Sequence, residues 1–452
     1  MREAYRRQMT IESPWLESEH AAELKAISDL LDRVPEICEL ASADLRAAGG
    51  AGTSAVGAKG LSAEQVVRAL IIKQMNGFCY RQLAFHLEDS RTYRTFCRLG
   101  LGTASPKRST LAACIKALRP ETLEAIHRQV VEQAVQCGVD DGKKLRFDAT
   151  VVESNIHHPT DSELLWDCVR VLTRLVKRAQ RILGTSKLAA SDHTRRAKRR
   201  RREINSARRK AKRIKPYRDL LRVTQMVRKD AEAAGAALRD TQEPGARRLV
   251  AQLEIFLERS LRVVDQTRRR VLEDEPVPAD EKLVSIFEEH TDIIRKDGRD
   301  TYYGHKICLA AGASSLVFDC RVLEGNPADS TLAVETIKRY IDARGESPRQ
   351  IACDGAFASR QNLEDIRKAG VEDIVFAKGR GLKVSEMAKS AWVFKTLRNF
   401  RAGIEGIISF LKRVFGLKRC TWRSRRSFES YVWSSVITSN LLVTARHLLN
   451  AT

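Results

Sequence analysis

The sequence predicts an α/β protein in which a mixed sheet is preceded by a helical region and interrupted by a long helical insertion. Three observations lead to this class. Short strand patterns alternate with helical patterns after residue 280, which is typical of a layered α/β core. Two long stretches, before residue 140 and between residues 163 and 279, carry helical patterns. Hydrophobic residues make up 43% of the 452 residues, which is enough to bury a core.

Residues 1–140 are expected to form a helical N-terminal region. A Gly/Ala/Ser-rich stretch, residues 48–60, interrupts it as a loop, and Ser62 caps the helix that follows. Later helices begin near Tyr80 and just after Lys107 and Arg108. Short helices joined by glycine turns, with basic residues at a helix start, fit a helix-turn-helix-like DNA-binding unit in which Lys107 and Arg108 contact DNA. An ordinary helical bundle fits the same pattern equally well.

Residues 163–279 are expected to form a basic helical or coiled-coil insertion, a long hairpin that turns near Pro244. Its positive charge is concentrated between residues 195 and 213, where Arg199, Arg200 and Arg201 are candidate phosphate contacts. A solvated helix face is the alternative, but the one-sidedness of the charge favours phosphate contact. An apolar stripe at helical spacing offers a dimer interface and contains Leu249, Leu253, Phe256, Leu257, Leu261 and Val264.

The core is expected in two segments, residues 141–162 and 280–452. Its strand patterns end at Asp148 and then cover residues 302–311, 316–323, 350–354 and 373–377. Its helical patterns cover residues 330–343, 359–369, the region around Glu405, and 428–449. Because the strands that end at Asp148 and Asp354 can lie side by side, we expect these two carboxylates to meet, with Glu405 approaching from a helix.

Three acidic residues are the candidate catalytic groups: Asp148, Asp354 and Glu405. Each one alone has an ordinary interpretation, as a cap, a tight turn or a helix-surface residue. Together they indicate a site for a hard cation, because carboxylates held close together repel one another unless a cation lies between them. Mg²⁺ prefers such oxygen ligands, and a pair of ions activates an attacking hydroxyl and stabilises the leaving oxygen at phosphorus. We therefore expect two Mg²⁺ or Mn²⁺ ions per active site.

The charge balance points to a nucleic-acid substrate. Lys and Arg total 80 against 57 acidic residues, a formal net charge of +23, and such an excess suits a phosphate backbone. No apolar segment approaches the length of a bilayer span, and no signal core is evident. The 10 cysteines form no Cys-x-x-Cys pair, which disfavours disulfides and zinc. A bacterial cytoplasmic, nucleoid-associated protein is the expectation.

Several of these motifs occur together in a known family. Asp148, the run Asp354-Gly355-Ala356-Phe357, and the series Arg401, Glu405 and Lys412 resemble the DDE-type transposases of bacterial insertion sequences. Residues 153–162 and 303–306 are similar to that family as well, and the resemblance covers about residues 60–450. It implies a ribonuclease H-like catalytic core, Asp148, Asp354 and Glu405 as the metal-binding triad, and Arg401 and Lys412 as contacts to transposon-end DNA.

One position departs from the related Y-R-E-K signature. A Tyr usually lies three residues before the Arg, and Arg398 occupies that position here, so the resemblance does not extend to a hairpin intermediate. Arg398 lies near Arg401 and Lys412 on the expected helix, as a DNA clamp requires. Lys378 and Arg380, just after the last strand, are further candidates for DNA contact.

Three functions remain open at the level of sequence. A transposase cuts double-stranded DNA at the terminal repeats and joins the freed 3′-hydroxyl to target DNA. A nuclease on the same core cuts without joining, and an architectural protein binds DNA through the basic insertion without cutting it. For the transposase, two DNA ends must be held together, so a homodimer on DNA is expected.

Overall fold

The computed structural model describes residues 18–48, 60–100, 102–184, 188–296 and 300–451. The chain divides into two compact units. The core unit comprises residues 1–155 and 304–452, and the bundle unit comprises residues 156–303. The architecture is a mixed six-stranded sheet with many helices, which confirms the predicted α/β class. Among the described residues, no helix is both long enough and apolar enough to cross a membrane.

Seven helices of the core unit precede the sheet, as the helical patterns predicted. The Gly/Ala/Ser-rich stretch at 49–59 lies outside the described residues. The expected cap is present: the Ser62 hydroxyl accepts from the Gln65 amide, and the Gln65 side chain accepts from the Ser62 amide. The helices are α1 (Glu19–Asp32), α2 (Glu36–Ala48), α3 (Ala63–Met75), α4 (Tyr80–Asp89), α5 (Arg91–Phe96), α6 (Arg108–Ala117) and α7 (Pro120–Gln136).

The sheet has the order β2-β3-β1-β5-β6, and β4 also pairs with β3. Its strands are β1 (Lys144–Glu153), β2 (Asp292–Lys296), β3 (Asp300–Ala311), β4 (Val317–Val322), β5 (Gln350–Cys353) and β6 (Asp373–Phe376). Strand β1 is antiparallel to β3 and parallel to β5, and β5 is parallel to β6. The sequence therefore predicted the strands correctly except for β2, which it missed, and for the end of β1.

The prediction that the first strand ends at Asp148 is wrong. Strand β1 continues to Glu153, because β3 pairs with it from Arg146 to Glu153, with Asp148 opposite Leu309. On the other side, β5 pairs only as far as Phe147 opposite Cys353. Asp148 therefore lies in the middle of a strand, at the level where its parallel neighbour stops and Asp354 begins.

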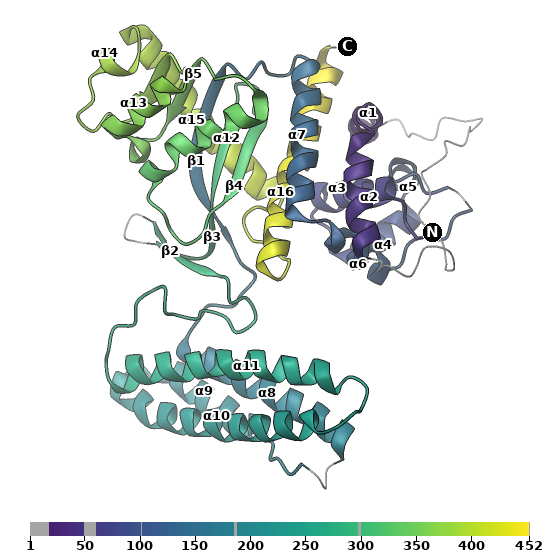
Figure 1. Cartoon of the computed structure of the whole chain (residues 1–452), viewed down its shortest axis with the longest axis vertical. Helices are drawn as coiled ribbons and strands as arrows, with labels where there is room; N and C mark the ends of the chain where they lie inside the picture. The colour runs from purple at the N-terminus through teal and green to yellow at the C-terminus, as the bar shows by residue number, and fades with distance from the viewer. Residues whose placement is uncertain (1–17, 49–59, 101, 185–187, 297–299, 452) are drawn as a thin grey trace. The chain divides into compact units, whose positions relative to one another are not determined.

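Side chains along β1 alternate between the two faces of the sheet. Leu145, Phe147 and Ala149 belong to the core beneath α12 (Ala333–Arg344) and α13 (Arg360–Lys368). Successive side chains of a strand point to opposite faces, so Arg146 and Asp148 point to the face covered by α15 (Ala391–Val414). In Figure 1, α12 lies on one side of the sheet and α15 on the other.

Helix α15 is held against the sheet by Arg146 of β1. Arg146 donates a hydrogen bond of 3.0 Å to the Phe400 carbonyl, and its guanidinium lies 4.6 Å from the centre of the Phe400 ring. A Cβ atom at Gly403 would overlap the Arg146 guanidinium. A glycine at this position thus lets the helix approach the strand closely enough for this contact.

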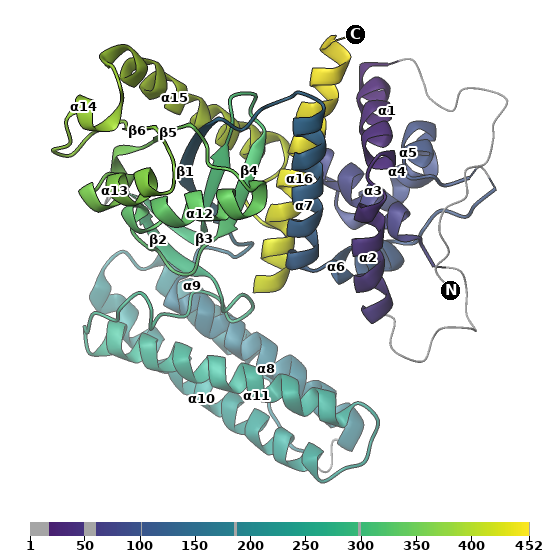
Figure 2. The same cartoon turned by 45° about the horizontal axis from the view of Figure 1, so that its top comes forward.

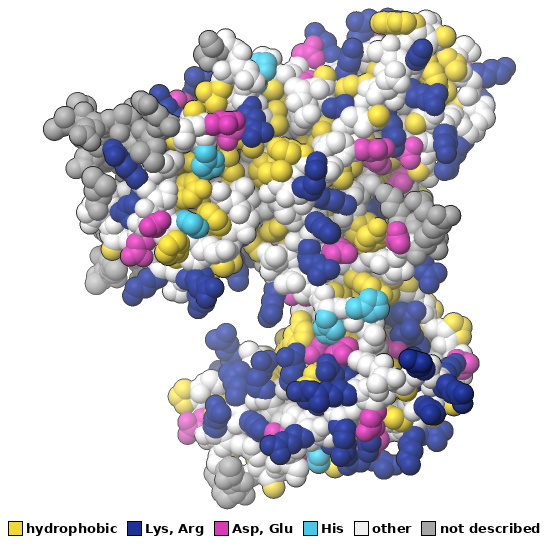
Figure 3. All heavy atoms as spheres, turned by 180° about the vertical axis from the view of Figure 1, so that it is seen from behind, with side chains coloured by type: hydrophobic (Ala, Val, Ile, Leu, Met, Phe, Trp, Pro, Cys, Tyr) yellow, Lys and Arg dark blue, Asp and Glu magenta, His cyan; other side chains and the backbone are white. Residues whose placement is uncertain are grey.

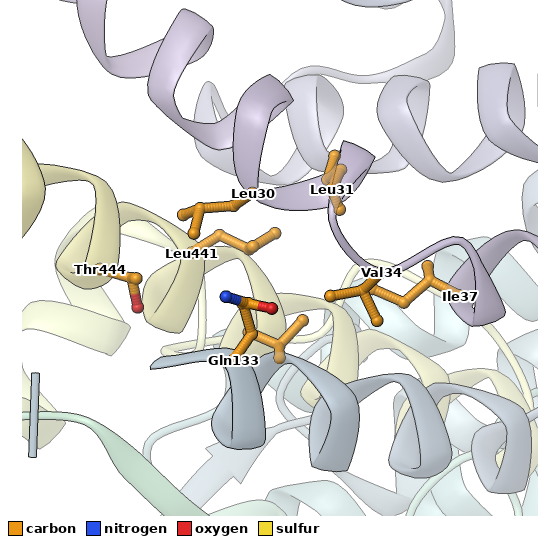
Figure 4. Close-up of a pocket in the computed structure, with 8 residues that line it drawn as sticks. Leu30, Leu31, Val34, Ile37, Gln133, Leu441 and Thr444 are labelled. Carbon is orange, nitrogen blue, oxygen red and sulfur yellow. The ribbon is translucent and has the colours of Figure 1, made fainter. Parts of the chain in front are cut away.

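The last helix, α16 (Arg425–Ala451), is buried along most of its length and packs against α7, α1 and α3. Figure 2 shows α7 and α16 side by side. A gap of about 10 Å³ remains between α1, α2, α7 and α16, lined mainly by apolar side chains such as Leu30, Val34 and Leu441 (Figure 4). It has room for no more than about one water molecule, so it is a packing gap and not a ligand site.

The bundle unit contains four packed helices where the sequence predicted a helical hairpin. They are α8 (Asp161–Leu183), α9 (Thr194–Ser206), α10 (Lys210–Arg239) and α11 (Ala246–Thr267). Helices α8, α10 and α11 all contact one another, and α9 packs on α8 and α10. Several apolar faces then bury one another, which a two-helix hairpin does not allow.

The apolar stripe on α11 is part of this bundle core. Leu249, Leu253 and Val264 are buried against α8 and α10, whereas Leu261 is exposed. The interpretation of the stripe as a dimer interface is therefore wrong, because its central residues already have partners within the same unit. The homodimer on DNA stays a prediction without an assigned surface.

Candidate active site

The three predicted acids come from separate elements of the core unit. Asp148 lies within β1, Asp354 directly follows β5, and Glu405 lies on α15. Because β1 and β5 are parallel neighbours, the two aspartates emerge at the same level of the sheet. Glu405 reaches the site from the helix that covers this face. The side chains of Asp148, Asp354 and Glu405 are 18%, 41% and 65% exposed, so the site is open toward the helix side.

One guanidinium joins all three carboxylates. The Arg401 Nη2 atom lies 3.9 Å from Asp148 Oδ2 and 3.5 Å from Asp354 Oδ1, and its Nη1 atom donates a hydrogen bond of 3.0 Å to Glu405 Oε1. The Nε atom of Arg401 is buried and has no hydrogen-bond partner among the described residues. Arg401 and Glu405 are four residues apart on α15, which places them on one helix face. The structure therefore gathers three acids separated by up to 257 positions around a single cation.

Asp148, Asp354 and Glu405 carry the kind of ligand atom that a hard cation prefers, but in this structure they are too far apart to bind the same ion. Among the residues that the structure describes, no three Asp, Glu, His or Cys side chains lie close enough to hold one metal ion. The three carboxylates do converge on one positive group, and carboxylate oxygens are the ligands that Mg²⁺ and Mn²⁺ prefer. In this structure the Arg401 guanidinium is the positive group that lies among them.

A cysteine beneath the site is held as a neutral thiol. Cys353, the last residue of β5, is fully buried. Burial raises the pKa of Cys353 well above its ordinary value, and the negative charges of Asp148 and Asp354 raise it further. A neutral thiol is a poor nucleophile and a poor metal ligand, so Cys353 is not a candidate for either role.

The glycine after Asp354 is explained by the loop that follows β6. A Cβ atom on Gly355 would lie 2.6 Å from the Lys378 Cβ atom and 3.0 Å from the Lys378 carbonyl oxygen. Gly355 has no positive φ angle. The residue is therefore small because Lys378 packs against it, and this packing places the exposed Lys378 beside the active site.

The other predicted DNA contacts of the core unit lie at three places. Arg398 is exposed on α15, and Lys412 is half-buried two turns after Glu405 on the same helix. Arg380 is exposed in the loop after β6, where its φ angle is 45°. Lys107 and Arg108 are exposed at the start of α6. The structure brings Arg401 into the acid cluster, and DNA contact by the other residues stays a prediction.

The basic surface of the bundle unit is dense, as Figure 3 shows. Its arginines are extensively paired within the unit. Arg200 donates to Asp219 at 2.6 Å and to Glu203 at 2.7 Å, and Arg201 donates to Glu163 at 2.8 Å. Arg199 is two-thirds exposed, with Glu203 4.0 Å away. DNA contact by Arg199, Arg200 and Arg201 stays a prediction, and for the last two it would compete with these ion pairs.

Two residues that position α15 were not found from sequence: Arg146 and Gly403. They fix the distance between β1 and α15, and the only sequence signal was a glycine inside a helical pattern. For Trp392, Trp422 and Trp433, the sequence favours core packing, with stacking on an unpaired base as the alternative. Trp422 and Trp433 are each 6% exposed, as core residues are, whereas Trp392 is 73% exposed on α15, so the core prediction is wrong for Trp392.

His157, His158 and His305 are of a residue type that can bind metal, but packing or phosphate contact is the interpretation that the sequence favours. Within the part of the chain that the structure describes, they belong to no cluster that could hold a metal ion. His305 is buried, its Nδ1 atom accepts a hydrogen bond of 2.9 Å from Arg425 Nη1, and its ring packs edge-on against Phe428. His157 lies 3.5 Å from Asp167 in the bundle unit. These contacts agree with packing and polar roles.

Comparison with known proteins gives two matches along the chain. The family model described as Transposase DDE domain matches residues 257–441, a segment that contains Asp354, Arg401 and Glu405. The model described as Transposase domain (DUF772) matches residues 17–117, which include Lys107 and Arg108. No curated protein and no solved structure matches the chain. Asp148 lies outside both matched segments, so its assignment rests on the geometry of the site.

Proposed function

We propose that this chain, an insertion-sequence transposase of the DDE type, cleaves DNA at transposon ends and joins the freed 3′-hydroxyl to target DNA. Asp148, Asp354 and Glu405 are the proposed ligands of two Mg²⁺ or Mn²⁺ ions. The observation that carries this proposal is the convergence of the three carboxylates on the Arg401 guanidinium. Acids that share one cation across three elements form a binding site for positive charge, which is what phosphoryl transfer by two ions requires.

Bound divalent ions would supply the activated hydroxyl and the stabilisation of the leaving 3′-oxygen. The residues of the chain position the carboxylates. The β1–β5 register sets the spacing of the two aspartates, and the Arg146–Phe400 contact fixes α15, and with it Glu405, against the sheet. Once Arg401 leaves the carboxylates, its guanidinium is available to a phosphate of the DNA strand, where a planar fork of donors binds well.

The test uses labelled duplexes that carry the ends of the chain's own element, incubated with Mg²⁺ or Mn²⁺. We expect 3′-end cleavage and joined products from the unmodified protein, and loss of both from Glu405→Gln, while DNA binding in EDTA is retained. A loss of at least about 100-fold is expected, since the group acts on charge that develops in the transition state.

Glu429→Gln is the matched control. Glu429 also lies four residues after an arginine on a helix and pairs with it, with Arg425 Nε 2.6 Å away, but it has no ion pair with Arg401. This variant is expected to cleave normally. Cleavage that survives Asp148→Asn overturns the assignment of the triad. Cutting without joined products indicates a nuclease, and tight binding without any cutting indicates an architectural protein.

A further inference from the structure

The outward face of α15 carries a row of residues that the packing of the protein does not explain. Exposed positions recur every three or four residues, from Trp392 near the start of the helix to Glu405 and Gly406 in its middle. The residues between them are Lys395, Thr396, Asn399 and Ala402. At 1.5 Å per residue, this row runs about 20 Å along the helix, the length of about six stacked bases. The row ends at Glu405, one of the three acids of the candidate active site.

Trp392 is the most exposed large hydrophobic residue among those that the structure describes, at 73%. A tryptophan left in water this fully gains nothing from burial, and its flat ring is a platform on which an unpaired base can stack. Its position at one end of the row places it about 20 Å along the helix from Glu405.

The charged residues beside Trp392 are free to meet phosphates. Lys389, Lys395 and Arg398 are exposed, and within the described residues none of them forms an ion pair. By contrast, the Arg401 side chain on the same helix is only 19% exposed and is paired with three acids. Unpaired positive charge that flanks an exposed aromatic ring is the combination by which proteins hold single-stranded nucleic acid.

Of two glycines on α15, one is not explained by packing within the protein. Gly403 is required by the protein's own packing, because a Cβ there would overlap Arg146. For Gly406, three residues later, no described residue outside the adjacent helix backbone comes within 4 Å of the position that its Cβ would take. A glycine inside a helix is destabilising relative to alanine, and no contact from the described residues requires a glycine at this position. A strand backbone that passes directly over the helix would need this space.

We propose that the outward face of α15 is a track for one DNA strand next to the active site, with Gly406 and Ala402 beneath its backbone and an unpaired base stacked on Trp392. Lys395 and Arg398 contact its phosphates. This inference rests on the proposed function for the identity of the substrate, but the binding it describes requires neither metal nor cleavage.

The experiment measures the affinity of the full chain in EDTA for a fluorescein-labelled duplex of the element's end that carries a short single-stranded extension. Trp392→Ala is expected to weaken binding by about 10-fold, and Trp392→Phe to restore most of the affinity, as stacking on an aromatic ring requires. Leu261→Ala, which truncates another exposed apolar residue in the bundle unit, is the control and leaves affinity unchanged. Oligothymidylate is expected to quench tryptophan fluorescence in the unmodified protein and to quench it much less in Trp392→Phe.

Gly406→Ala supplies the second readout. It is expected to raise the melting temperature of the free protein by about 1–2 °C, as a helical Gly→Ala change does, and yet to weaken binding of the extended duplex severalfold. Unchanged DNA affinity in both Trp392→Ala and Gly406→Ala overturns the track, even if the protein cleaves its ends normally. Light scattering that shows a dimer disrupted by Trp392→Ala, with DNA affinity intact, also overturns it and assigns the face to a contact between copies. Weakened binding in a protein that never cleaves supports the track and counts against the proposed function alone.

Discussion

Two arginine-rich helices of this protein use their charge differently. On α9, Arg196, Arg200 and Arg201 turn toward acids of their own unit, and Asp219 alone accepts from two of them. On α15, Arg401 turns inward to the acids of the active site, while Lys395 and Arg398 face outward and pair with none of the described residues. Both helices look like DNA-binding elements in the sequence, yet much of the charge on α9 stabilises the bundle.

Charge density alone therefore does not identify a nucleic-acid surface. An arginine that is half-buried and bound to a carboxylate has to give up that partner before it can bind a phosphate, whereas an exposed lysine only releases counterions. Substitutions at four places on the two helices and their partners test this distinction.

The largest effect is expected from Gly403→Ala on α15. The added methyl group would overlap the Arg146 guanidinium, so the helix moves outward or the Arg146–Phe400 hydrogen bond is lost. We expect a cost of about 1–3 kcal/mol in the free energy of unfolding. Because Glu405 shifts with the helix, we also expect about a 100-fold loss of end cleavage. Denaturant unfolding measures the stability, and a cleavage assay measures the activity.

Gly406→Ala is the control for stability. An equal loss of stability in Gly403→Ala and Gly406→Ala would contradict the role given to Arg146.

Asp219→Asn, a substitution on α10, tests whether the arginines of α9 stabilise the fold. Hydrogen bonds from Arg196 and then Arg200 lower the pKa of Asp219 from 3.8 to about 2. A carboxylate with a depressed pKa stabilises the folded state above its unfolded value of about 4. That contribution is lost as the pH falls from about 4 toward 2. We expect Asp219→Asn to cost about 2 kcal/mol at neutral pH.

The measurement for Asp219 is the free energy of unfolding of the full chain as a function of pH. The variant is expected to lose less stability than the unmodified protein between about pH 4 and pH 2, because one depressed carboxylate no longer takes up a proton there. Parallel pH curves for the two proteins would show that Asp219 does not hold these arginines.

Arg401→Gln tests the cation at the centre of the acid cluster. Without the guanidinium, the three carboxylates have no competing positive group, so divalent ions are expected to bind the free protein about tenfold more tightly, which corresponds to about 1.4 kcal/mol. The increase in melting temperature with Mg²⁺ concentration reports this affinity without any catalysis. Arg401→Lys, which keeps a cation, is the control. Equal Mg²⁺ affinity in all three proteins would show that Arg401 does not occupy the ion site.

The smallest effect is expected from Lys395→Gln combined with Arg398→Gln. Each lost phosphate contact lowers the slope of log affinity against log salt by about 0.9, so the double variant is expected to lower it by about 2 and to weaken binding about fivefold. Arg196→Gln combined with Arg200→Gln on α9 is expected to lower stability and leave the slope unchanged. A lower slope in the α9 pair would restore the bundle unit as a phosphate-binding surface.

Local patterns in the sequence determined much of the architecture. The strand and helix periods gave the α/β class, and Ser62 and Gln65 predicted the cap at Ser62. A strand was expected over residues 350–354, and β5 ends one residue earlier, at Cys353. Asp148 and Asp354 stood out because carboxylates at the end of apolar strand patterns are unusual, whereas Glu405 lies in a basic helical pattern. The structure gathers the three acids around one cation. Their identity as metal ligands stays a prediction.

Only the tertiary structure decided how far β1 extends and which charges and apolar faces are already paired. The length of β1 follows from its partner β3, which lies about 150 residues away in the sequence. The apolar stripe on α11 fits either a core or an interface, and its packing against α8 and α10 makes it part of the core. Arg200 could contact either DNA or an acid of the protein, and Asp219 on α10 binds it. Gly403 and Gly406 are both glycines within one helical pattern, and the sequence does not distinguish them. In the structure, Gly403 faces Arg146 and Gly406 faces open space. Such distinctions depend on contacts between distant segments, which no local pattern contains.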